Sequence, residues 1–210
     1  MTIERALLPA STQRGRGTRQ ALLDAARAVF ERDGYLEARI TDIAAEAGVA
    51  YGTFYAHFRS KPEVFSAVMA DLWSRLVVPA PAADGTVTPY ERVLASNRHF
   101  LAGYRDNARL FAVVEQAATS LEEIQELRKR IHTDNADRVA KAIRRWRRDG
   151  IAAPDVHPGD AATALICMIG RSAYYWYVVE GRRTTRSEAE TLTRLWLRGL
   201  GIAVPENRKR

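Results

Sequence analysis

Hydroxyl and ammonium groups that could bind phosphate lie close together in one short segment of the chain, between Thr41 and Lys61. A threonine at a helix N-terminus can offer its hydroxyl and the first backbone N–H groups to a phosphate, and a lysine that opens a helix adds charge where the dipole already attracts anions. We therefore consider phosphate binding for both residues. The alternatives are N-capping alone for Thr41 and simple solvation for Lys61.

Two short helices joined at Gly48 would position these groups, an arrangement that lets a second helix enter the major groove of DNA while the first crosses the backbone. Apolar residues have the spacing to lock the two helices together and against Phe30: Ile43, Ala44, Ala47, Val49, Phe54 and Phe58. The outward positions are then Ala50, Tyr51, Gly52, Thr53, Tyr55 and His57. A glycine inside a helix costs about 1 kcal/mol relative to alanine. Close approach of DNA to the backbone explains Gly52, with tight helix packing as the alternative.

The segment from about Thr18 to Phe65 resembles the DNA-binding domain of the tetracycline-repressor (TetR) family. The resemblance rests on residue types at fixed offsets: Thr41, Ile43-Ala44, Ala47-Gly48-Val49, Gly52-Thr53, Tyr55, His57-Phe58 and Ser60-Lys61. It implies that one group of residues approaches bases, namely Ala50, Tyr51, Gly52 and Thr53, and that another holds phosphates, namely Thr41, Tyr55, His57 and Lys61. Members of the family often carry polar residues at the positions of Ala50 and Tyr51. Specificity here would rest instead on methyl contacts from Ala50 and Thr53, on Tyr51, and on arms such as Arg14, Arg16 and Arg39.

The rest of the chain also has apolar residues at helical spacing, and long alternating strand patterns are missing. We therefore predict an all-α protein. The resemblance implies an N-terminal three-helix helix-turn-helix domain and a C-terminal helical domain for ligand binding and dimerisation. The boundaries are a flexible basic tail at 1–17, the DNA-binding domain at 18–65, and the effector-binding and dimerisation domain at 66–206. A proline-rich loop from Pro79 to Gly85 should precede helices at about 89–104, 107–117, 121–149, 158–180 and 188–200. Capping-box spacing marks helix starts at Ser60, Thr88, Ser120 and Ser187, and Pro89 and Pro158 suit first turns.

Aromatic residues are dense in the second half, where most must be core but several together could line an apolar cavity. The layout from Ala117 to Ile202 is similar to lipophilic-ligand members of the family, the ethionamide-resistance type. Our candidate ligand-binding residues are Phe100, Tyr104, Phe111, Asn135 and Trp146. Asn135 lies in the apolar stripe of the long helix, so its amide either bonds to a neighbouring helix or points at a ligand. Arg128 and Arg138 flank that face and could pair with Glu115 or with an acidic effector.

The last two expected helices are apolar on more than one face, which a monomer could not bury. A symmetric four-helix interface would bury them and would set two DNA-binding domains at a fixed spacing. Our candidate dimer-interface residues are Leu165, Ile169, Ala173, Leu192, Leu195 and Trp196.

Charge and composition restrict the remaining function classes. The 210 residues carry a formal net charge of +7, which favours anionic partners such as nucleic acid or a membrane surface. We see no signal peptide, and Arg171 interrupts the one stretch that suggests a membrane span, 161–179, so we expect a cytoplasmic protein without a membrane partner. Cys167, the lone cysteine, excludes an internal disulfide and should be a small buried residue.

We expect no catalytic residues, no metal site and no cofactor. The four histidines lack ligand spacing, and although His132 and Asn135 lie one turn apart, no nucleophile is evident beside them. The sequence thus predicts a transcriptional repressor that binds double-stranded, pseudo-palindromic operator DNA as a homodimer and is released by a small apolar or aromatic effector. Two alternatives stay open. An enzyme would turn over a small molecule without binding DNA, and a ligand-independent DNA-binding protein would have a fully packed C-terminal half.

Overall fold

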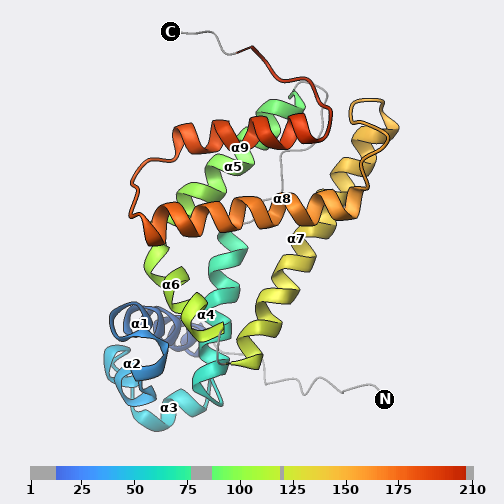
Figure 1. The fold of residues 1–210 in the computed structure, drawn as a ribbon. Coiled ribbons are helices and arrows are strands. Elements are labelled where there is room, and N and C mark those ends of the chain that lie inside the picture. The colour runs from blue at the N-terminus through green and yellow to red at the C-terminus, as the bar shows by residue number, and fades with distance from the viewer. Residues whose placement is uncertain (1–12, 77–86, 119–120, 207–210) are drawn as a thin grey trace, which may run out of the picture. The chain divides into compact units, whose positions relative to one another are not determined.

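The computed structural model describes residues 13–76, 87–118 and 121–206, except for the side chain of Arg14. These residues form helices and connecting turns and contain no strand. The chain divides into two compact units, residues 1–70 and 71–210. The helix α4, Lys61–Leu76, begins in the first unit and ends in the second. The all-α prediction is confirmed (Figure 1).

The first unit contains three helices before α4: α1 (Gln13–Glu37), α2 (Ile40–Glu46) and α3 (Tyr51–Tyr55). Glycines occupy two turns of this unit, and the turn at Gly48 was predicted from the sequence. Gly34 interrupts α1 with φ 76° and ψ 174°, and Gly48 has φ +66° between α2 and α3, a conformation that favours glycine. The first helix begins at Gln13, five residues before the expected start at Thr18, and residues 1–12 of the expected tail lie outside the described residues.

Aromatic rings form the core of the first unit. Phe30 packs edge-on against Phe65 at 4.9 Å between ring centroids and stacks on Tyr35 at 5.8 Å. Phe54 and Phe58 are completely buried, as expected, and the guanidinium of Arg19 covers the Phe58 ring at 4.9 Å. This core fixes α2 and α3 on α1, so that the remaining faces of the two short helices are exposed.

The second unit continues with four helices, a helical segment of π type, and a last helix. The bounds are α5 (Pro89–Asp106), α6 (Ala108–Ala118), α7 (Glu122–Arg148), α8 (Pro158–Ala173), η1 (Tyr174–Val179) and α9 (Arg186–Gly199). The most extensive contacts between helices are those of α7 with α8 and of α5 with α9 (Figure 1). The sequence predicted each of these helices, but it gave no indication that the last turns before Glu180 are π-helical. The predicted loop from Pro79 to Gly85 lies outside the described residues.

Local signals explain most helix starts in the second unit. Thr88 and Glu91 form a complete capping box, and Pro89 and Pro158 each occupy the first turn of a helix. The Ser187 signal was wrong, because α9 begins at Arg186 and the Ser187 hydroxyl donates to Glu188 instead, at 2.9 Å. Ser120 lies outside the described residues.

A buried hydrogen bond sets the register between α5 and α9. Asn97 is 2 % exposed and donates through Nδ2 to Oγ1 of the fully buried Thr193, at 3.0 Å. The Thr193 hydroxyl in turn donates to the carbonyl of Ala189 at 2.7 Å. A one-turn slip of α9 would leave the Asn97 amide unsatisfied in an apolar core, so this pair favours a single alignment of the two helices.

Candidate nucleic-acid interface and internal cavity

Seven of the eight predicted DNA-binding residues lie on the surface of the first unit, on α2, on α3 and in the turn that follows α3. Thr41 is exposed in the first turn of α2, whose N-cap is Arg39, so the capping alternative for Thr41 does not apply. The others are exposed or half-buried: Ala50, Tyr51, Gly52, Thr53, Tyr55 and His57.

The outer face of α3 is open and aromatic. A Cβ added at Gly52 would meet nothing within 4 Å, which rules out tight packing within the described chain as the reason for this glycine. Tyr51 and Tyr55, 51 % and 46 % exposed, join their hydroxyls at 2.9 Å across one helical turn. Large aromatic side chains that are exposed beside an unobstructed glycine indicate a binding surface, because such side chains are usually covered by a partner.

Lys61 differs from the other predicted phosphate ligands. Its Nζ donates to three backbone carbonyls, those of Tyr35, Leu36 and Ala38, at 2.9, 3.1 and 2.9 Å. It also lies 4.8 Å from the centroid of the Tyr35 ring, and its burial lowers its pKa. All three ammonium donors are thus used inside the unit, so the structure corrects our expectation of a phosphate contact: Lys61 ties the start of α4 to the end of α1.

The second unit contains a large, mostly apolar cavity of about 1200 Å³. All five predicted ligand-binding residues line it: Phe100, Tyr104, Phe111, Asn135 and Trp146. They come from α5, α6 and α7, and α4 and α8 contribute further wall residues. Although any one of these aromatics could have been core, together they surround an open space.

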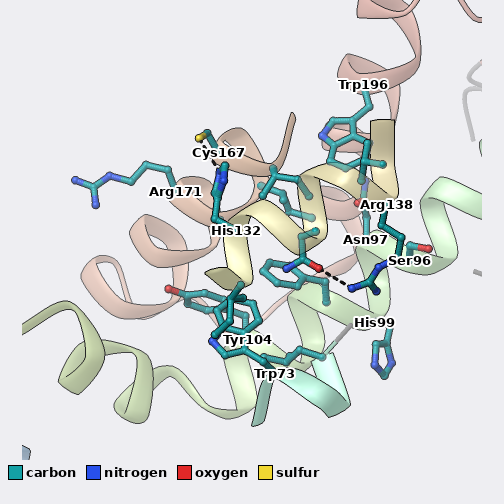
Figure 2. A pocket seen from close by; sticks show the side chains of 18 of the residues that line it. Trp73, Ser96, Asn97, His99, Tyr104, His132, Arg138, Cys167, Arg171 and Trp196 are labelled. Atoms are coloured by element: carbon teal, nitrogen blue, oxygen red, sulfur yellow. Dashed lines mark hydrogen bonds between the residues drawn. The ribbon is translucent and has the colours of Figure 1, made fainter. Parts of the chain in front are cut away.

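Four aromatic rings gather at one end of the cavity. Tyr104 and Phe111 stack with 3.7 Å between centroids, and Trp73 meets Phe100 at 6.2 Å and Phe111 at 5.5 Å (Figure 2). Burial strongly raises the pKa of Tyr104, so its phenol stays neutral. Trp73 was missed by the sequence analysis, because its place on this wall depends on how α4 packs against α5 and α6.

Polar groups are distributed along the rest of the wall. Asn135 makes no bond to a neighbouring helix within the described chain; its Oδ1 accepts from Arg138 Nη2 at 3.1 Å, one turn along α7. Arg128 pairs with Glu115 at 3.1 Å, one of the two alternatives we left open. At the opposite end of the cavity from Trp73, the 8 % exposed Trp196 keeps a buried Nε1 without a hydrogen-bond partner among the described residues (Figure 2).

Cys167 lies on the cavity wall and is exposed there, contrary to our expectation of a buried residue. Its Sγ is 3.3 Å from Nε2 of His132, a residue 35 positions earlier in the chain (Figure 2). The sequence placed no thiol beside His132, because the pair forms only when α7 packs on α8.

The predicted dimer-interface residues require a correction, because most are already buried within one chain. Five of the six are at most 9 % exposed, namely Leu165, Ile169, Ala173, Leu192 and Trp196, and two of these, Ile169 and Trp196, line the cavity. Such residues cannot present a surface to a partner. Leu195 is 52 % exposed, and the exposed apolar residues Tyr175 and Val179 follow α8 in η1.

None of the described helices is both long and apolar enough to span a membrane. No group of three or more histidine, cysteine, aspartate or glutamate side chains in the described ranges is arranged to hold a metal ion.

Comparisons with known proteins cover both units. Residues 22–68 match the family profile "Bacterial regulatory proteins, tetR family", and residues 94–200 match "Transcriptional regulator EthR, C-terminal domain". The HTH-type transcriptional regulator SrpR of Pseudomonas putida is 47 % identical over 53 residues, which cover 25 % of this chain and 25 % of SrpR.

Solved structures extend the likeness of fold to nearly the whole chain. NalD, the secondary repressor of the MexAB-OprM multidrug efflux pump in Pseudomonas aeruginosa, has a TM-score of 0.68 and 23 % identity over 90 % of this chain and 98 % of its own. The fatty acid degradation regulator FadR from Bacillus halodurans has a TM-score of 0.74 and 19 % identity over 89 % and 97 %. With a helix-turn-helix unit matched at one end and a regulator domain over more than half of the chain at the other, this protein belongs to the TetR family of DNA-binding transcriptional regulators.

Proposed function

We propose that the protein is a repressor that binds a pseudo-palindromic operator as a homodimer and is released when a small, largely apolar molecule enters the cavity of the second unit. The observation that carries this proposal is the path of α4. This helix begins in the DNA-binding unit at Lys61 and ends on the cavity wall, where Trp73 and Leu76 line the space.

In the DNA-bound state, the exposed face of α3 enters the major groove. Ala50, Tyr51, Gly52 and Thr53 approach the bases, and Thr41, Tyr55 and His57 contact phosphates. The open space at Gly52 supports close approach of the helix backbone. Lys61 is left out of this set because its donors are used by backbone carbonyls.

An effector acts through the contacts that hold the end of α4. Trp73 packs against the rings of Phe100 and Phe111, and the carbonyl of Arg75 lies 2.7 Å from Nε2 of His99. A ligand between these rings changes where the end of α4 is most stable. The ligand can alter operator affinity only by as much as its own binding free energy differs between the DNA-bound and the released placement of α4. This coupling free energy is usually about 1–3 kcal/mol in allosteric proteins, which corresponds to a roughly 5- to 150-fold change in affinity.

Dimerisation uses the outward side of η1 and α9. Tyr175 and Val179 are 53 % and 54 % exposed, and Leu195 is 52 % exposed. Exposed apolar side chains of this size favour an interface with a second copy, which would also place two α3 helices for the two halves of an operator. A protein that acts on operator DNA works in the cytoplasm.

Selection of bound fragments from random DNA tests the first half of the proposal, and release of the best fragment by small molecules tests the second. We expect an inverted repeat whose affinity falls steeply with salt, and release by compounds that also raise the melting temperature of the free protein. If no sequence binds at low salt, the operator proposal is wrong. If DNA binds but no ligand of the cavity changes the affinity for DNA, the effector part of the proposal is wrong. The protein would then be a ligand-independent DNA-binding protein, an alternative that the presence of the cavity disfavours.

A further inference from the structure

The cavity lining is mostly apolar, but it carries more basic than acidic side chains. Six basic side chains and one acidic side chain, Glu115, line the cavity. The basic residues are Arg92, Arg128, Lys129, Arg138, Arg145 and Arg171. Apolar surface alone would accept neutral and charged ligands according to their hydrophobicity, but a cationic rim lowers the free energy of an anion in particular.

Most of these cations are already engaged. Arg128 pairs with Glu115 at 3.1 Å, Lys129 with Glu126 at 3.7 Å and Arg145 with Asp149 at 3.8 Å. Arg92 also has an interaction partner. The guanidinium of Arg171 lies over the ring of Tyr174 at 5.2 Å, and its end points away from the cavity (Figure 2).

Arg138 is different, because the side chain to which it donates is neutral. Its Nη2 donates to Oδ1 of Asn135, and within the described residues no carboxylate forms an ion pair with it. This hydrogen bond also turns the Asn135 amide so that its Nδ2 donor has no acceptor in the described chain. A guanidinium and an amide N–H side by side on a cavity wall can both donate to the oxygens of one anionic group.

The aromatic end provides the complement. All four rings line the cavity, and of these Trp73 and Phe100 are half-exposed whereas Tyr104 and Phe111 are buried, so Trp73 and Phe100 offer the larger accessible aromatic surface. In Figure 2, Arg138 lies between the Trp73 end and the Trp196 end. A ligand whose charged group meets Arg138 therefore has an aromatic surface on one side for its apolar body.

We propose that the cavity selects amphipathic organic anions, whose carboxylate or sulfonate is held by Arg138 and Asn135 while an aromatic or alkyl body packs against Trp73 and Phe100. This inference rests on the proposed effector site and specifies the chemistry of its ligand. The positive charge makes the site discriminate between an acid and a neutral molecule of the same skeleton.

Two fluorescent probes with one skeleton test the proposal on the full chain without DNA: 1-anilinonaphthalene-8-sulfonate and the neutral N-phenyl-1-naphthylamine. Arg138→Gln should weaken binding of the sulfonate about tenfold or more, the size of one lost charge-assisted hydrogen bond, and leave the neutral probe unchanged. Arg138→Lys should restore part of the loss. Arg144→Gln is the matched control, because Arg144 is an exposed arginine of α7 that does not line the cavity.

Phe100→Ala shows whether the probes occupy the cavity, since it should weaken both. If Arg138→Gln and Arg144→Gln leave the affinity for the sulfonate equal, or if Arg138→Gln weakens both probes alike, the selection of anions is wrong while the effector site stands. If neither probe responds to Phe100→Ala, the cavity is not a ligand site, and both this inference and the effector part of the proposed function fail. Arg138→Lys keeps the test decisive if Arg138→Gln folds poorly. If the folded Lys variant binds the sulfonate as tightly as wild type, and salt does not change that affinity, the charge of this side chain has no role in binding and the proposal is overturned.

Discussion

Replacing Lys61 with methionine separates a structural role from a phosphate contact. Methionine keeps most of the apolar stem of the side chain and removes the ammonium that donates to the carbonyls of Tyr35, Leu36 and Ala38. A hydrogen bond from a charged donor contributes about 1.5–3 kcal/mol net. The three bonds share one partly exposed charge and are not additive, so we expect Lys61→Met to lower the free energy of unfolding by about 2–3 kcal/mol.

The assay has two parts, urea unfolding followed by circular dichroism and operator affinity as a function of salt. Loss of a phosphate contact would reduce the slope of log affinity against log salt by about 0.9. We expect the slope of folded Lys61→Met to equal that of wild type, because Nζ is occupied inside the protein. Lys141→Met is the control: Lys141 is exposed on α7, and its loss should change stability by less than about 0.5 kcal/mol.

The reasoning is refuted by the reverse pattern. If Lys61→Met unfolds at the same urea concentration as Lys141→Met and its salt slope is smaller by about one, the ammonium leaves the carbonyls to bind a phosphate, and the original expectation for Lys61 was right.

Three further predictions concern assembly, function and pH. Leu195→Glu should sediment as a folded monomer at micromolar concentration, because Leu195 is exposed in one chain and its replacement need not disturb the fold. Leu36→Glu, at another exposed leucine, should leave assembly unchanged. A Leu195→Glu variant that stays dimeric would contradict the proposed interface. Asn135→Ala should weaken effector release and preserve operator binding of the free protein, and His57→Ala should do the reverse; loss of both stability and DNA binding in Asn135→Ala would make the amide structural. Burial raises the pKa of Tyr177 to about 12, so the stability that its neutral phenol confers is complete below about pH 10 and is lost as pH rises toward 12. Because its hydroxyl has no hydrogen-bond partner in the described chain, Tyr177→Phe should be at least as stable as wild type at pH 8 and should lose less stability by pH 11 in urea titrations; equal losses would contradict the shift.

Local signals in the sequence predicted the helices well, because a helix start depends on residues three or four positions apart. The capping box of Thr88 and the first-turn prolines are examples, and Gly48 makes the turn after α2 as expected. The TetR-like segment could be recognised equally well, because the residues that define it lie at fixed spacings within about twenty positions.

Contacts between distant residues could not be predicted in the same way. The bonds from Lys61 reach carbonyls 23–26 positions earlier, and His132 meets Cys167 across 35 positions. From side-chain type alone, we expected Lys61 to be solvated or bound to phosphate and Cys167 to be buried. Both expectations were plausible, and both differ from the contacts in the structure. Only the packing of one helix on another determines which donors are used and which thiol is exposed.

The same limit explains why the predicted dimer interface was mostly wrong while the predicted cavity residues came together. An apolar residue on α8 can face a neighbouring helix, a cavity or a partner chain, and helical periodicity shows that it avoids water without showing which of the three it meets. Ala173 is buried against neighbours, Ile169 lines the cavity, and Tyr175, two residues after Ala173 in η1, stays exposed. Of the six residues that the sequence assigned to a second copy of the chain, three are buried between helices, two line the cavity and Leu195 is exposed. A ligand in the cavity would cover apolar surface that one chain leaves unfilled, and its binding should stabilise the second unit whether or not the protein is bound to DNA.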